Sequence, residues 1–529
     1  MVQSSLQIHF DEKSIDEVFA DLDTSRLPGA SVGIAIGGRP VYRRGFGLAS
    51  MELPVTLTPQ TRMRIYSMTK HFTCLAYLLL CEEGKAAIDD TVGKYLPELH
   101  AVTRRVTMRQ LMSNTSGIRD ACEIRWFFSG IETTVAARDL LTLYRDIPDV
   151  NCDPGEAWCY NNGGFHILSA VIEKLAEEPL EAVFRKRIFE PVGMHDSLLR
   201  RVDTDFIANC ATMHMAAAGG GFEKRYLAGE LLGEGGVVST VDDILRWLKH
   251  MARPAIGDAK TWAVLTASQR LHSGADTGYG LGLFCRDYRG IDTISHSGKG
   301  LGNSSQMIKV PGCDLDLVVV VNRHDVGAME LSARVLDACL GMPSDPKWND
   351  TGRVSGTFFS PKSGRVIQLY IKDGKQMSLV DGVEEWQLGW GDDLVLRPNQ
   401  ASFSNIALRL CGQLSRPDSI REEYFGSSDE LIPVRPESVR NEEGISGNFL
   451  ADSIGVQMRV EADATAGQAV TVGRFGSRTH RLERLCGNLW RMRATDTTDW
   501  GGILAVESRR KEFTLRTSRT WAVRFRRLE

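Results

Sequence analysis

The stretch Arg64-Ile-Tyr-Ser-Met-Thr-Lys-His-Phe72 places a serine, Ser67, three residues before a lysine, Lys70. An apolar helical pattern continues from Leu75, and Gly84 is the expected stop of this helix. If the helix begins near Ser67, residues three apart lie on one face and their side chains can touch. A lysine amine beside a serine hydroxyl can take or hold its proton, which makes the serine a better nucleophile. The pattern predicts a nucleophilic Ser–Lys pair, and the alternative is a solvated lysine at a helix start.

The same S-x-x-K spacing occurs at two other places, so the surrounding sequence must decide between them. Ser344-Asp-Pro-Lys347 contains a proline that prevents the helix needed to pair the two side chains. Ser508-Arg-Arg-Lys511 lies in a strand-like region, where positions three apart point to opposite faces. Because only Ser67 opens an amphipathic helix, we take Ser67 and Lys70 as the catalytic candidates.

Length and composition indicate a globular protein with about three domains. The chain has 529 residues, of which 43% are hydrophobic and 25% charged, and its formal net charge of -4 indicates neither a nucleic-acid nor a membrane partner. The N-terminus lacks a secretory pattern, the 11 cysteines form no CxxC pair, and no cluster has metal-ligand spacing. We expect a cytoplasmic protein with reduced thiols, without metal or cofactor, whose assembly could be a homodimer.

Hydrophobic periodicity predicts an α+β domain over residues 1–341. Two alternating segments, 31–36 and 40–49, are joined by Gly37-Gly38, which is a hairpin signal. Further strand and helix signals return late in this region, at 279–285, 292–295, 306–310, 315–321 and, for a closing helix, 327–340. Strands at both ends with helices between them predict one antiparallel sheet flanked by helices.

The remainder of the chain has the pattern of short strands and turns, and it contains a weak internal repeat. Val354-Ser-Gly-Thr-Phe-Phe-Ser recurs as Ile445-Ser-Gly-Asn-Phe-Leu-Ala, and alternating strands follow each copy. Each unit has about the length of a small barrel. The expected boundaries are a linker at 342–353, a β-barrel at 354–431, a second linker at 432–444 and a second β-barrel at 445–529.

Two further motifs carry candidate site residues. Tyr160-Asn-Asn162 is the only Y-x-N in the chain. A lysine ammonium nearby would favour the phenolate, so that Tyr160 could act as a general base, with Asn162 as a polar contact. The alternative is a loop tyrosine beside a turn-forming Asn-Asn-Gly-Gly run. His-Ser-Gly occurs at 272–274 and at 296–298, and only the second ends a predicted strand, where Gly298 would allow close approach of a substrate backbone.

These three patterns, in this order, resemble the signature of the serine penicillin-recognising hydrolases: S-x-x-K, then Y-x-N or S-D-N, then K-T-G or a variant. The stretches Gln110-Leu-Met-Ser-Asn-Thr-Ser-Gly117 and Gly235-Gly-Val-Val-Ser-Thr-Val-Asp242 are similar to two other landmarks of that family. The resemblance covers about residues 25–340 and implies a beta-lactamase/transpeptidase-like fold. The two β units narrow it to the D-aminopeptidases, in which two eight-stranded antiparallel barrels follow the catalytic domain. Ser67-Met-Thr-Lys-His-Phe-Thr-Cys74 is also similar to their S-x-S-K-Q-F-T-C run.

The resemblance implies a serine aminopeptidase or amidase that releases an N-terminal D-amino acid from short peptides, amides or esters through an acyl-enzyme on Ser67. Lys70 would stay near the serine oxygen and Tyr160 would pass the proton to the leaving amine; which of the two is the base stays open. Backbone N–H groups of Ser67 and Lys299 would hold the oxyanion. The alternatives are an esterase or beta-lactamase-like hydrolase with the same serine, and a catalytically lapsed ligand-binding protein.

His296 stands where K-T-G members have a lysine, and a neutral imidazole binds a carboxylate less firmly. A substrate with a cationic amine is therefore expected, and the resemblance implies an acidic partner on a loop of the last domain. The corresponding stretch, Ala494-Thr-Asp-Thr-Thr-Asp-Trp500, offers Asp496 and Asp499, of which we favour Asp496. The alternative is a pair of solvated aspartates in a hairpin turn. Phe284, in place of a polar residue of the family, is expected to narrow the acyl pocket.

Overall fold

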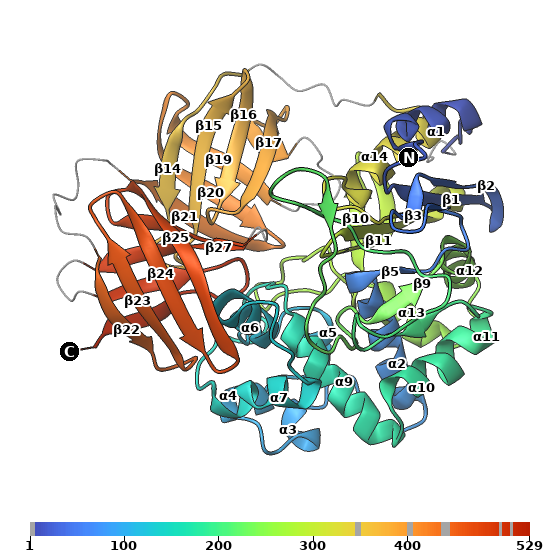
Figure 1. Ribbon diagram of the computed structural model, residues 1–529, viewed down its shortest axis with the longest axis horizontal. Coiled ribbons are helices and arrows are strands. Elements are labelled where there is room, and N and C mark those ends of the chain that lie inside the picture. Colours follow the sequence, from blue (N-terminus) through green and yellow to red (C-terminus); the bar gives the residue numbers. More distant parts are fainter. Residues whose placement is uncertain are drawn as a thin grey trace.

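The computed structural model describes residues 6–343, 351–398, 406–434, 445–496, 500–507 and 512–528. It consists of an N-terminal domain of helices around one sheet, followed by two closed barrels (Figure 1). The predicted fold class, an α+β domain followed by two antiparallel β-barrels, is confirmed. The S-x-x-K motifs that begin at Ser344 and Ser508 lie outside the described residues.

The N-terminal domain is built on a 6-stranded antiparallel sheet with the order β10-β11-β12-β13-β1-β2. The strands are β1 Ala30–Ile36, β2 Arg39–Phe46, β10 Phe284–Tyr288, β11 Ile291–Gly300, β12 Asn303–Val310 and β13 Leu315–Val321. β1 pairs with β13, so the two ends of the domain meet in the centre of the sheet. Gly37 and Gly38 connect β1 to β2 with φ values of 59° and 69°, a conformation that glycine adopts without steric cost.

Helices cover both faces of this sheet. Helices α1 (Glu12–Val18) and α14 (Ala328–Leu340) pack on one face, and α2 (Lys70–Glu82) and α12 (Val241–Ala252) lie in the core on the other. The remaining helices are α3 Val92–Tyr95, α4 Ala101–Arg104, α5 Met108–Met112, α6 Ala121–Ser129, α7 Ala137–Leu141, α8 Leu143–Asp146, α9 Asn162–Ala176, α10 Leu180–Phe184, α11 Glu190–Val192 and α13 Ala259–Thr266. No helix in the described ranges has both the length and the apolar character needed to cross a bilayer.

The predicted strand over 279–285 is wrong for most of its length, because β10 begins only at Phe284. Gly282 has a φ of 70°, and a Cβ atom there would come within 2.8 Å of backbone atoms of Lys70 and His71. The alternation of glycine with large residues therefore marks a turn packed against the start of α2 and not an extended strand.

Both C-terminal units are closed antiparallel barrels. The first contains β14 Gly356–Phe359, β15 Val366–Lys372, β16 Lys375–Val380, β17 Glu384–Trp390, β18 Val395–Pro398, β19 Ile406–Gln413, β20 Arg416–Tyr424 and β21 Ser427–Pro433. The second contains β22 Gly447–Ala451, β23 Val456–Ala462, β24 Ala466–Gly473, β25 Gly476–Cys486, β26 Leu489–Ala494, β27 Gly501–Glu507, β28 Glu512–Arg516 and β29 Val523–Arg527. Closure pairs the first strand of each barrel with the last, which removes the exposed edges.

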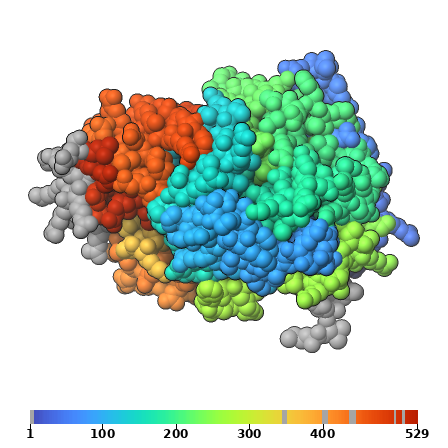
Figure 2. Space-filling view, turned by 90° about the horizontal axis from the view of Figure 1, so that it is seen from below, coloured from blue at the N-terminus to red at the C-terminus, as the bar shows by residue number. Residues whose placement is uncertain are grey.

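The second barrel packs on α6, and one apolar cluster includes residues of both. Figure 2 shows the orange-to-red barrel against the cyan part of the chain that contains α6. Thr471 donates a hydrogen bond to the carbonyl of Phe128 at 2.9 Å across this contact. The first barrel reaches the N-terminal domain through Phe425, whose ring stacks on Trp158 at 3.6 Å. The first barrel is therefore anchored beside the segment that carries Tyr160, and the second barrel is anchored on α6.

Candidate active site

Ser67 and Lys70 lie together at the N-terminal end of α2. Ser67 is part of a short 3₁₀ turn, Tyr66–Thr69, that continues directly into the helix. Lys70 Nζ lies 3.1 Å from Ser67 Oγ, and the lysine side chain is fully buried. Tyr66 has a positive φ of 45°, which is a strained conformation for an aromatic residue. The serine is thus presented on a tight turn next to its lysine.

Two further acceptors fix the amine of Lys70. Its Nζ donates to Asn162 Oδ1 at 2.7 Å and to the backbone carbonyl of Glu234 at 2.7 Å. Both partners can only accept in these contacts, so they occupy two N–H groups of the amine. The remaining position on Nζ faces Ser67 Oγ, either as a third N–H or as a lone pair. The geometry allows a neutral Lys70 to accept the proton of the serine.

Tyr160 lies beside this pair on the segment that leads into α9. Its ring centroid is 4.7 Å from Lys70 Nζ and 5.0 Å from the guanidinium carbon of Arg519, so the ring lies close to both side chains. Asp120 holds the start of α9 by accepting backbone hydrogen bonds from Asn162 at 3.1 Å and Gly163 at 2.9 Å. A carboxylate at this helix N-terminus satisfies N–H groups that have no partner within the helix.

His296 is placed differently from the expectation of a substrate contact. The side chain is buried, with 1% of its surface exposed. Nδ1 donates to its neighbour's carbonyl, Ser297 O, at 2.6 Å, so Nε2 accepts from the hydroxyl of Tyr279 at 3.2 Å. Burial, together with the charge of Lys70, lowers the pKa of His296 to about 3. The imidazole is neutral, as expected, but both of its nitrogens are bound within the protein.

Gly298 and Lys299 lie on the part of β11 that runs past Ser67. β10 pairs only with residues 291–295 of β11, so residues 296–300 extend beyond it. A Cβ atom at Gly298 would lie 2.1 Å from the backbone oxygen of Ile65, so this glycine permits close packing of the serine turn on β11. Lys299 is exposed and lines the cavity that contains Ser67.

Asp496 is not among the residues that line this cavity. Arg478 binds its two carboxylate oxygens at 2.7 and 2.6 Å through Nη2, and the same guanidinium donates to the carbonyl of Trp126 at 2.7 Å. The ion pair therefore helps to attach the second barrel to α6. Asp499, the other candidate, lies outside the described residues.

The cavity at Ser67 has a volume of about 250 Å³ and is formed by two domains. Trp500 and Arg519 enter it from the second barrel, and the ring of Trp500 contacts the ring of Trp126 edge-on at 5.5 Å. Glu234 also lines the cavity. Burial opposes ionisation of Glu234, but the imidazole of His166 at 3.0 Å outweighs it and keeps the pKa of this carboxyl below its usual value. None of the four residues Trp126, Trp500, Arg519 and Glu234 is among the candidates predicted from the sequence.

A second cavity of about 210 Å³ lies behind Tyr160, where all three domains meet. Phe284, which was expected to narrow the acyl pocket, lines this junction cavity instead, together with Trp386 of the first barrel and Trp521 of the second. Arg519 lines both cavities. The first barrel therefore forms one wall of the cavity beside Tyr160.

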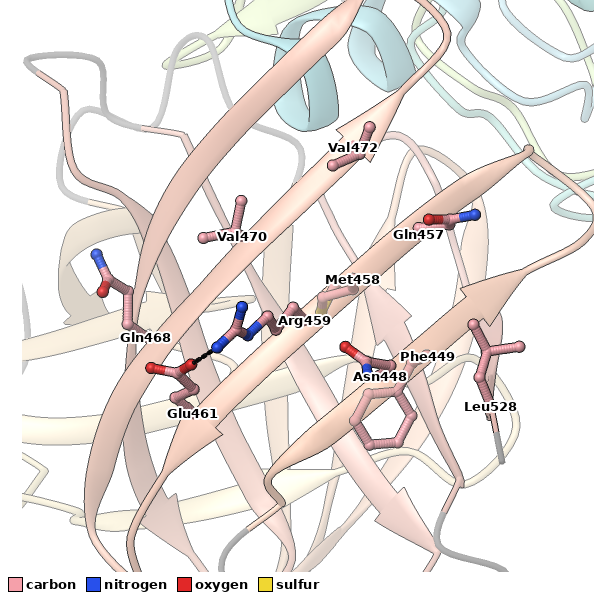
Figure 3. A pocket seen from close by; sticks show the side chains of 10 residues that line it. All are labelled: Asn448, Phe449, Gln457, Met458, Arg459, Glu461, Gln468, Val470, Val472 and Leu528. Atoms are coloured by element: carbon pink, nitrogen blue, oxygen red, sulfur yellow. Dashed lines mark hydrogen bonds and ion pairs between the residues drawn. The ribbon is translucent and has the colours of Figure 1, made fainter.

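Two larger hollows, of about 680 and 640 Å³, lie on the barrels, and the second of them is on the outer face of the second barrel (Figure 3). Figure 3 shows its polar side chains spread over neighbouring strands, with Arg459 paired to Glu461. None of the ten residues that line it is a serine, cysteine or histidine. The Ser67 cavity is therefore the candidate active site.

Ser67 lies against the amine of Lys70 on one helical turn, beside the edge of an antiparallel sheet. In this fold, that arrangement defines a serine hydrolase of the penicillin-recognising class. The chain belongs to the Beta-lactamase family, whose family model matches residues 15–340.

Known relatives agree with this assignment over a longer part of the chain. D-aminopeptidase from Brucella canis is 25% identical over 452 residues, which cover 83% of this chain and 82% of the relative. A D-aminopeptidase from Brucella melitensis is 27% identical over 450 residues, with the same coverage of 83% and 82%. Since each match covers 83% of this chain, it must extend past the residues that the family model matches, into the C-terminal part of the chain.

Solved structures show the same fold at lower identity. An octameric penicillin-binding protein homologue from Pyrococcus abyssi superimposes with a TM-score of 0.56 at 19% identity and covers 91% of this chain and 98% of its own. D-amino acid amidase from Ochrobactrum anthropi superimposes with a TM-score of 0.54 at 23% identity and covers 62% of this chain and 97% of its own. At these identities the likeness is evidence for the fold alone.

Proposed function

We propose that the protein is a serine aminopeptidase or amidase that releases an N-terminal D-amino acid from short peptides, amides or esters through an acyl-enzyme on Ser67. The observation that carries the proposal is the contact of 3.1 Å between Lys70 Nζ and Ser67 Oγ, with Nζ fixed by Asn162 and the carbonyl of Glu234. The curated relatives that match over 83% of the chain are D-aminopeptidases, which supports the substrate class.

In the proposed acylation step, neutral Lys70 accepts the proton of Ser67 while Oγ attacks the substrate carbonyl carbon. The developing oxyanion is held by the backbone N–H groups of Ser67 and Lys299. The hydroxyl of Tyr160 gives a proton to the leaving nitrogen as the C–N bond breaks, and the acyl group stays on Ser67. Water then attacks the ester carbonyl and gives a proton to the Tyr160 phenolate, while Lys70 returns to Ser67 the proton that it took as the ester C–O bond breaks.

The ammonium of the substrate requires a partner in the cavity. Because Arg478 binds Asp496, we assign this role to the indole rings of Trp126 and Trp500, whose centroids lie 5.5 Å apart in the cavity wall. Cations bind favourably over indole rings when water is excluded. Trp500 lies on the same stretch that the family resemblance indicated, four residues beyond Asp496.

Hydrolysis of D- and L-alanine p-nitroanilide, measured side by side with a short acyl ester, tests the proposal. We expect the D-anilide alone to be cleaved, with kcat/KM reduced by about 10⁴-fold or more in Ser67→Ala. Faster turnover of the ester than of the D-anilide would favour an esterase. Failure of a serine-directed covalent probe to label Ser67 in the wild type would instead indicate a lapsed enzyme.

A further inference from the structure

Arg519 brings a positive charge from the second barrel into the active site. It lies between β28 and β29, and its side chain lines the cavity that contains Ser67. The connection is fixed on both sides of it. Thr517 and Ser518 donate hydrogen bonds to the carboxylate of Glu123 at 2.5 and 3.0 Å, and the carbonyl of Arg519 accepts from Asn151 Nδ2 at 2.7 Å. The position of this guanidinium is therefore determined by the docking of the barrel.

The guanidinium is only weakly engaged by the protein. Its Nη1 lies 3.4 Å from Asp120 Oδ2, which is longer than the 2.7–2.9 Å of a strong bond between charged groups. Asp120 already accepts backbone hydrogen bonds from Cys122, Asn162 and Gly163. The Arg519 side chain keeps 25% of its surface accessible, whereas Asp120 has none. The guanidinium therefore has donors available to a ligand in the cavity.

The charge of Arg519 is maintained in this setting. Burial opposes the charge, but the carboxylates of Asp120 and Glu123 outweigh burial and raise the pKa of Arg519 above its usual value. Lys299 adds a second exposed cation to the same cavity. The carboxyl group of Glu234 in the wall is paired with His166. The space beside the reacting groups is consequently suited to an anion.

The location of Arg519 indicates which part of the substrate would carry that anion. Its guanidinium carbon is 5.0 Å from the ring centroid of Tyr160, the residue that gives a proton to the leaving nitrogen in the proposed reaction. In a peptide substrate that nitrogen belongs to the next amino acid, and only the α-carbon separates it from the carboxylate carbon. A free α-carboxylate on the leaving amino acid would therefore come within reach of Arg519.

We propose that Arg519 is a specificity-determining residue that binds the free α-carboxylate of the leaving amino acid, so that the preferred substrates are dipeptides rather than amides or longer peptides. This inference rests on the proposed aminopeptidase function. It assigns to the second barrel a role that His296 cannot perform, because the imidazole is neutral and is bound to Tyr279 and Ser297.

The test compares D-alanyl-L-alanine with D-alanyl-L-alaninamide, which differ only in the terminal charge. In the wild type we expect kcat/KM to favour the acid. In Arg519→Gln we expect the acid to lose about 10- to 100-fold while the amide changes little, because only the acid loses a bond between charged groups. Arg519→Lys, which keeps the charge, should recover part of the loss. Arg459→Gln is the matched control, since that arginine is 70% exposed on the outer face of the same barrel.

Each contrary result has a distinct meaning. Equal losses for acid and amide in Arg519→Gln would overturn the proposal, since Arg519 would then act only by positioning Tyr160. A wild-type preference for the amide would overturn it without any variant. If the wild type hydrolyses neither compound, the proposed aminopeptidase function is rejected independently of the carboxylate site. The carboxylate site is then judged by whether the acid slows covalent labelling of Ser67 more than the amide does, and equal protection rejects it.

Discussion

His480 makes the attachment of the second barrel to α6 sensitive to acid. Its side chain is fully buried, and Nε2 lies 3.1 Å from Thr471 Oγ1. The hydroxyl of Thr471 donates to the carbonyl of Phe128, so Nε2 carries the proton and donates to Thr471. Nδ1 has no hydrogen-bond partner among the described residues. A proton added to Nδ1 would therefore create a charge with no acceptor.

The size of the effect on the free energy of unfolding follows from the shift in the pKa of His480. Burial, with a smaller effect of Arg478 that Asp496 partly offsets, lowers the pKa of His480 from 6.5 to about 3. At a pH between these two pKa values, the imidazole of His480 is neutral in the folded protein and protonated in the unfolded chain. Its contribution to stability is complete above pH 6.5 and is lost as the pH falls, by about 1.4 kcal/mol per pH unit. At pH 5.0 the loss from this one residue is about 2 kcal/mol.

The variant His480→Gln removes the titration and keeps a donor for Thr471. We expect its free energy of unfolding, measured by urea denaturation at pH 7.5 and 5.0, to fall by about 2 kcal/mol less than that of the wild type. Other buried histidines contribute equally to both proteins and cancel. His195→Gln, at an exposed position, is the control and should follow the wild type. An identical pH dependence in His480→Gln and the wild type would refute the reasoning.

Two substitutions near Ser67 have separable effects. Gly298→Ala places a methyl group 2.1 Å from the backbone oxygen of Ile65, so we expect thermal unfolding to show a loss of several degrees in Tm. The control is Gly219→Ala, which should leave Tm unchanged because no atom lies within 4 Å of the new Cβ. Equal Tm values for the two variants would contradict the packing argument. Asn162→Ala removes the acceptor 2.7 Å from Lys70 Nζ, and we expect kcat/KM for D-alanine p-nitroanilide to fall about 10- to 100-fold because a hydrogen bond to a buried amine is lost. An unchanged kcat/KM would show that Asn162 does not hold the amine.

The predictions that follow from local sequence agree with the structure for a clear reason. Ser67 and Lys70 are three residues apart at a helix start, and the backbone alone brings such side chains together. The glycine hairpin at residues 37–38 and the paired strands of the barrels follow in the same way from turn chemistry and from alternation of period two. The fold class was predictable because these signals are repeated along the chain.

The surroundings of a residue depend on segments that are far apart in the sequence. His296 was selected for its place at the end of a strand, but Tyr279 and the tight packing of the serine turn on β11 decide that it is buried and bound. Asp496 was selected from a family resemblance, whereas the approach of Arg478 and α6 decides what its carboxylate binds.

The sequence by itself determined the contact between Ser67 and Lys70 and the class of fold, since each depends on contacts within a few residues or on a repeated pattern. Only the tertiary structure decided that Glu234 contributes a carbonyl to Lys70, and that Trp500 and Arg519 enter the cavity from a barrel. No local pattern marks such residues, because their position results from the packing of one domain on another. The Ser67–Lys70 pair is thus local in origin, whereas the walls of its cavity depend on how the domains pack.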